Sequence, residues 1–129
     1  MIWIMKKVFY RKLIRDLLPD FFTKIGVAFH GYSLKQADFE KALLQKVEEE
    51  ASGVARARTR KEVIGELADV LDVIDEVRRV KKISAQELRV ARQANKKEKG
   101  GFAKRFFLVW TEEHGYKTNE RRGARHQAG

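Results

Sequence analysis

Acidic residues gather beside the apolar faces of two stretches in the middle of this 129-residue chain. Glu49 and Glu50 lie near the end of the first stretch, and Glu66 and Asp69 lie near the start of the second. Because Glu66 and Asp69 are three positions apart, a helix would present both carboxylates on one face. If two such helices pair antiparallel across the short break between them, Glu50, Glu66 and Asp69 converge.

Carboxylates that converge in this way repel one another and need a counter-charge. Mg²⁺ suits oxygen ligands and keeps open positions for phosphate oxygens and water. The pattern therefore indicates Mg²⁺-dependent hydrolysis of a phosphoanhydride, with Mn²⁺ as a substitute metal. An alternative stays open, because the same acids could form a solvated helix face balanced by Lys46, Arg78 and Arg79.

The helices that must position these acids are indicated by the spacing of apolar residues. One helix is expected from about Gln36 to Ala57, and a second begins at a Thr59–Glu62 capping box and runs to about Val80 or Lys81. The apolar face of the second helix is broad, which predicts that it is the most buried element. The first helix carries one apolar stripe, formed by Phe39, Leu43, Val47, Ala51 and Val54.

The rest of the chain adds shorter elements. A short strand is expected over Val8 to Ile14, followed by a short helix at Pro19 that Gly26 ends. A Ser84–Glu87 capping box begins another helix, which stops before Gly100-Gly101. The aromatic segment 102–110 is then expected to pack on the helices. Together these features predict an all-α antiparallel helical bundle with a short extended N-terminal segment.

Composition limits the organisation of the chain. Its length favours one helical domain over residues 1–113, followed by a basic, disordered tail over 114–129. The apolar face over residues 63–77 exceeds what one protomer covers, which predicts a homodimer or homotetramer. The chain has no cysteine and no stretch of the roughly 20 apolar residues that a membrane helix needs, so a cytoplasmic protein without a membrane partner is expected.

The net charge of +10 is unevenly distributed. Both ends are basic, whereas residues 31–80 are mildly acidic. Two interpretations stay open: cations that bind phosphate around an acidic metal site, or a basic tail that binds nucleic acid. Lys46, Lys99 and Arg105 are the candidates for phosphate contact, because they lie near the acidic helices or the paired glycines.

Three segments carry a family resemblance. They are Tyr10 to Asp16 with the following Leu17-Leu18-Pro19, the acidic stretch Glu66 to Ile74, and Lys99 to Phe102 with Arg105 and Leu108. Together with the paired glutamates at 49 and 50, their order and spacing resemble the MazG-like, all-α nucleotide pyrophosphohydrolases, which are related to phosphoribosyl-ATP pyrophosphohydrolase.

The resemblance implies a function and assigns roles to the acids. A nucleoside triphosphate or related nucleotide would be cleaved between its α and β phosphates, releasing pyrophosphate. Glu50, Glu66 and Asp69 would hold Mg²⁺, with Glu49 or Asp72 supporting them. The family has a further glutamate where this chain has Gly53, so the alternative is a weak or silent member that binds a nucleotide or nucleic acid.

The opening motif allows two roles for its charged residues. Lys12, Arg15 and Asp16 match the family's N-terminal pattern. They could contact substrate, or they could form an ion pair that fixes the N-terminal segment.

Overall fold

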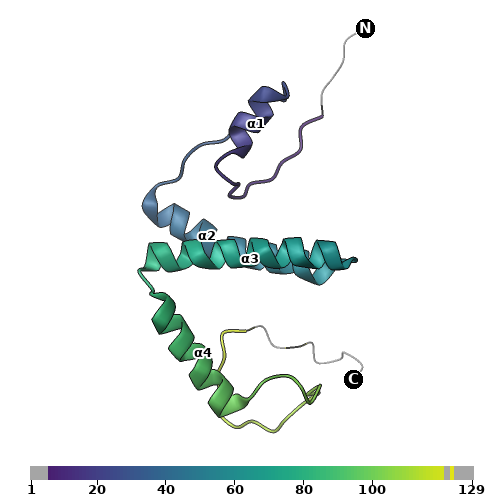
Figure 1. The fold of residues 1–129 in the computed structure, drawn as a ribbon, viewed down its shortest axis with the longest axis vertical. Helices are drawn as coiled ribbons and strands as arrows, with labels where there is room; N and C mark the ends of the chain where they lie inside the picture. The colour runs from purple at the N-terminus through teal and green to yellow at the C-terminus, as the bar shows by residue number, and fades with distance from the viewer. Residues whose placement is uncertain (1–5, 121–122, 124–129) are drawn as a thin grey trace. The chain divides into compact units, whose positions relative to one another are not determined.

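The structure is a computed structural model that describes residues 6–120 and 123. Its regular elements are four helices: α1 (Leu18–Lys24), α2 (Gln36–Arg56), α3 (Arg60–Lys81) and α4 (Ala85–Lys99) (Figure 1). No strand occurs among the described residues, so the predicted all-α class is confirmed. The expected strand over Val8 to Ile14 is wrong; that segment has no regular structure. None of the described helices is both long and apolar enough to cross a membrane.

The chain divides into two compact units, Met1–Arg89 and Val90–Gly129. The first contains α1, α2, α3 and the start of α4, and the second contains the rest of α4 and the segment after it. Residues 114–120 of the predicted tail form no helix, and residues 121–122 and 124–129 lie outside the described part.

Helices α2 and α3 form the antiparallel pair that the short break predicts. Only residues 57–59 separate them, and the helices run side by side (Figure 1). The predicted capping box is present, because Thr59 Oγ1 accepts a hydrogen bond from Glu62 N at 3.1 Å while Glu62 Oε2 accepts one from Thr59 N. Lys81 Nζ and Glu40 Oε2, 3.2 Å apart, join the far ends of the pair, and this hydrogen bond lowers the pKa of Glu40.

The shorter elements begin and end as the turn residues predict. Pro19 lies in the first turn of α1, and Gly26 follows that helix with a φ of 76°. Ser84 and Glu87 form the second capping box, in which Glu87 N donates to Ser84 Oγ at 3.0 Å. Helix α4 ends at Lys99, directly before the paired glycines.

The apolar core of the described chain is small. Leu43 on α2 is its one buried apolar residue, at 5% exposure. The expectation that α3 is the most buried helix is wrong, because Ile64, Leu67 and Leu71 remain 47–61% exposed. The expected packing of segment 102–110 is also wrong, since its large apolar side chains are all exposed. A helix pair can cover only one face of each partner, and the broad face of α3 extends beyond it.

Leu43→Ala tests this small core. The substitution is expected to lower the free energy of unfolding by about 2–5 kcal/mol, because it leaves a cavity between α2 and α3. The neighbouring Leu44→Ala is the matched control, since Leu44 is 51% exposed and little is lost there. Urea denaturation followed by circular dichroism measures both. Equal losses in the two variants would contradict the assignment of Leu43 as the central contact.

Candidate metal centre

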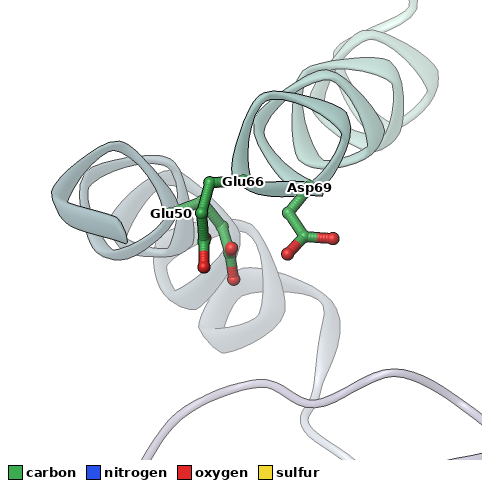
Figure 2. A group of neighbouring side chains, drawn as sticks. All are labelled: Glu50, Glu66 and Asp69. Carbon is green, nitrogen blue, oxygen red and sulfur yellow. The ribbon is translucent and has the colours of Figure 1, made fainter. Parts of the chain in front are cut away.

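Three carboxylates from two helices meet on one side of the α2–α3 pair. Glu50 comes from α2, and Glu66 and Asp69 come from α3. One oxygen from each lies within 4.8 Å of the other two. Figure 2 shows all three side chains directed to the same side of the helices. The convergence that the sequence predicts for Glu50, Glu66 and Asp69 is therefore confirmed.

The spacing of these oxygens suits a hard divalent ion. Mg²⁺ binds oxygen at about 2.1 Å, so two oxygens on one ion are at most about 4.2 Å apart. The limit of 4.8 Å between the carboxylate oxygens is slightly wider, so small rotations of the three side chains would bring their oxygens onto one ion. All three donors are carboxylates, which favours Mg²⁺ or Mn²⁺ over ions that prefer nitrogen or sulfur.

Two cations lie against this group of acids. Lys46 Nζ lies 3.2 Å from Glu50 Oε1 and 3.4 Å from Glu49 Oε2, and its side chain is only 14% exposed. Arg15 Nη2 lies 2.8 Å from Asp69 Oδ1 and 2.8 Å from Asp72 Oδ2. With Glu66, the group contains five carboxylates, and these two cations pair with four of them. The carboxylates therefore outnumber the paired cations. The ion pairs therefore balance only part of the acidic charge.

Arg15 links the N-terminal segment to α3. Its hydrogen bonds to Asp72 and Asp69 raise the pKa of the guanidinium, so it stays charged. Of the two roles open to the opening motif, the structure shows the ion pair for Arg15. Sequence reasoning did not find its partners, which lie 54 and 57 positions away. The sequence shows that Asp69 and Asp72, three positions apart, share a helix face. That spacing does not indicate which distant basic residue pairs with them.

Gly53 lies directly against Glu66. A Cβ atom added at Gly53 would overlap Glu66 Oε2, so the carboxylate occupies the space of a side chain at that position. The absence of a side chain at Gly53 therefore has a structural consequence. Its lack of a side chain gives the Glu66 carboxylate room to lie against α2, beside Glu50.

An open hollow borders the same carboxylate. It is lined at the turn between α2 and α3 by Gly53, Arg56, Ala57, Arg58, Glu62 and Glu66. Glu62 is already used in the capping box, whereas Arg56 and Arg58 add positive charge. The sequence did not predict this hollow. There, Arg56 and Arg58 are part of the polar stretch that separates the two predicted helices. It places two guanidinium-bearing residues beside a candidate metal ligand.

The remaining predicted site residues lie elsewhere. Glu49 is not part of the converging group; its Oε2 is buried and faces Lys46 without forming a hydrogen bond. Lys99 and Arg105 belong to the second unit. Lys99 Nζ lies 5.3 Å from the centre of the Tyr116 ring, and Arg105 has a φ of 53° in a turn. Their role in phosphate contact stays a prediction.

Comparison with protein-family models, curated proteins and solved structures finds no match to this chain. Function is therefore inferred from the geometry of the site.

Arg15→Gln tests the link between the N-terminal segment and α3. The substitution removes both ion pairs, so faster hydrogen exchange is expected over residues 12–24, with a stability loss of about 1 kcal/mol because the pairs are exposed. Arg11→Gln is the matched control, since Arg11 contacts the ring of Phe9 in its own segment. Hydrogen exchange with mass spectrometry measures both. Unchanged exchange in Arg15→Gln would show that the ion pairs do not hold the segment.

Proposed function

We propose that this protein is a Mg²⁺-dependent nucleotide pyrophosphohydrolase. The observation that carries the proposal is the convergence of the Glu50, Glu66 and Asp69 carboxylates on one side of the α2–α3 pair. A divalent ion bound there would offset the repulsion of the three acids and hold phosphate oxygens at its open positions. The resemblance to MazG-like enzymes adds the substrate class, a nucleoside triphosphate or related nucleotide, and the α–β bond as the point of cleavage.

The chain's own residues have separate tasks in this proposal. Glu50, Glu66 and Asp69 hold the ion, which when bound polarises the phosphate and lowers the pKa of water. Lys46 keeps the Glu50 carboxylate in place and adds positive charge beside the ion. Glu49 faces Lys46 and supports its position. Arg56 and Arg58 offer charge to the leaving pyrophosphate in the hollow beside Glu66.

A homo-oligomer forms part of the proposal. Ile64, Leu67 and Leu71 follow one another at spacings of three and four on α3, which makes a continuous exposed apolar stripe. Such a stripe is typical of a helix face that a second subunit covers. We propose a homodimer or homotetramer that buries it.

A second candidate function is nucleotide binding without turnover. Gly53 favours it, because the resemblance implies one carboxylate more than this chain supplies. The two functions differ in a single measurement. A protein that binds a nucleotide with Mg²⁺ or Mn²⁺ and releases no pyrophosphate from any nucleoside triphosphate supports the second candidate.

Loss of the converging carboxylates tests the enzymatic proposal. A nucleotide panel with Mg²⁺ is expected to yield pyrophosphate, and Glu66→Gln or Asp69→Asn should lower kcat/KM by about a hundredfold or more. Asp75→Asn is the control, because Asp75 pairs with Arg78 further along α3. Persistence of full activity in both site variants would reject the assigned centre.

Gly53→Ala separates a structural role from a role in metal binding. Alanine is the better helix former, so stability should rise by up to about 1 kcal/mol. The Glu66 carboxylate must move away from the new Cβ, so Mg²⁺ affinity should fall by about tenfold. Gly65→Ala on α3 is the matched control, since its Cβ meets nothing within 4 Å, and it should gain stability without losing affinity. Isothermal titration with Mg²⁺ and urea denaturation give the two quantities. Equal Mg²⁺ affinity in both variants would rule out the role assigned to Gly53.

A further inference from the structure

The segment after α4 is apolar at its centre and charged at both ends. Residues 104–113 read KRFFLVWTEE. The five central side chains, Phe106 to Trp110, are 61–85% exposed. From Phe106 to Trp110 the backbone forms no hydrogen bond to the backbone of another described residue, and the chain after α4 is drawn as a loop without helix or strand (Figure 1). Exposed β-branched and aromatic residues with an unpaired backbone favour the addition of a β-strand.

The order of charges in this segment selects the partner. Lys104 and Arg105 stand at its start, and Glu112 and Glu113 stand at its end. Two copies placed antiparallel bring the basic start of each against the acidic end of the other. Two copies placed parallel would set like charges side by side, which is destabilising. The segment is therefore complementary to itself in the antiparallel direction.

The residue pattern also selects a register. In a two-fold antiparallel pair, facing residues share one side of the sheet, and the residue at the axis faces its own copy. With Leu108 at the axis, Phe106 faces Trp110, and the basic residues that precede each strand lie at the same end as the acidic residues that follow the other. On the other side of the sheet Phe107 faces Val109. Each favourable pair occurs twice because of the symmetry.

We propose that residues 106–110 pair with the same residues of a second copy as antiparallel β-strands centred on Leu108. The strand begins after the turn in which Arg105 N donates to Phe102 O at 3.0 Å. Five residues is an ordinary strand length, and the charged residues flank the ladder at both ends. The proposal concerns the second unit alone and does not rest on the proposed hydrolase function.

Disulfide trapping tests the register in the full chain, which has no cysteine of its own. Facing residues in antiparallel strands have Cα atoms about 4.5–5.5 Å apart, within the range of a disulfide. Leu108→Cys is therefore expected to form a disulfide-linked dimer under mild oxidation. Val109→Cys is the matched control, because it faces Phe107 of the other copy. No cross-link in Leu108→Cys, or equally fast cross-linking in both variants, would overturn the proposal.

A charge exchange in the Leu108→Cys background tests the partner. Lys104→Glu with Arg105→Glu, and separately Glu112→Lys with Glu113→Lys, each set like charges together, so each variant should cross-link about tenfold less at equal concentration. An equimolar mixture of the two restores all the charge pairs and should yield the mixed dimer, which mass spectrometry distinguishes. Failure of the mixture to recover cross-linking overturns the proposal. Loss of cross-linking in only one of the two charge variants overturns it as well.

Discussion

The antiparallel contact between α2 and α3 is the constraint on which the candidate site depends. Only three residues separate the helices, so α3 must fold back along α2. Glu50 lies seven residues before Ala57, and Glu66 lies seven residues after Thr59. With a rise of 1.5 Å per residue, both lie about 10 Å from the break and therefore at the same level. Asp69 joins them because it is one helical turn further along the same face.

The cost of this arrangement is electrostatic. The three converging acids lie next to Glu49 and Asp72, and Lys46 and Arg15 offset only part of their charge through the ion pairs described here. The two cations come from different parts of the chain, one from α2 itself and one from the N-terminal segment. Arg15 therefore makes the position of that segment depend on the charge of α3. Binding of a divalent ion at Asp69 would compete with Arg15 for the same carboxylate, and this competition would couple the candidate metal centre to the N-terminal segment.

The sequence predicted what depends on local pattern. Helix positions, both capping boxes and the meeting of Glu50 with Glu66 and Asp69 follow from the 3.6-residue period and a short connection. It did not predict the contact of Arg15 with Asp69 and Asp72, nor the close approach of Glu66 to Gly53. Both depend on the path of the chain over long separations and on side-chain conformation. The sequence also overestimated the burial of α3. An apolar helix face indicates that another surface should cover it, but it does not indicate which surface does so.

The apolar surfaces left exposed differ in kind, and this difference bears on assembly. The stripe of Ile64, Leu67 and Leu71 lies on a helix, whereas Phe106 to Trp110 lie in a segment without regular structure whose backbone forms no hydrogen bond to the backbone of another described residue. A helix face is covered by side-chain packing, and an unpaired backbone is covered by a second strand. If each pairs with its own copy about a separate two-fold axis, the two interfaces together generate an assembly larger than a dimer, which closes as a tetramer when the axes are perpendicular and intersect.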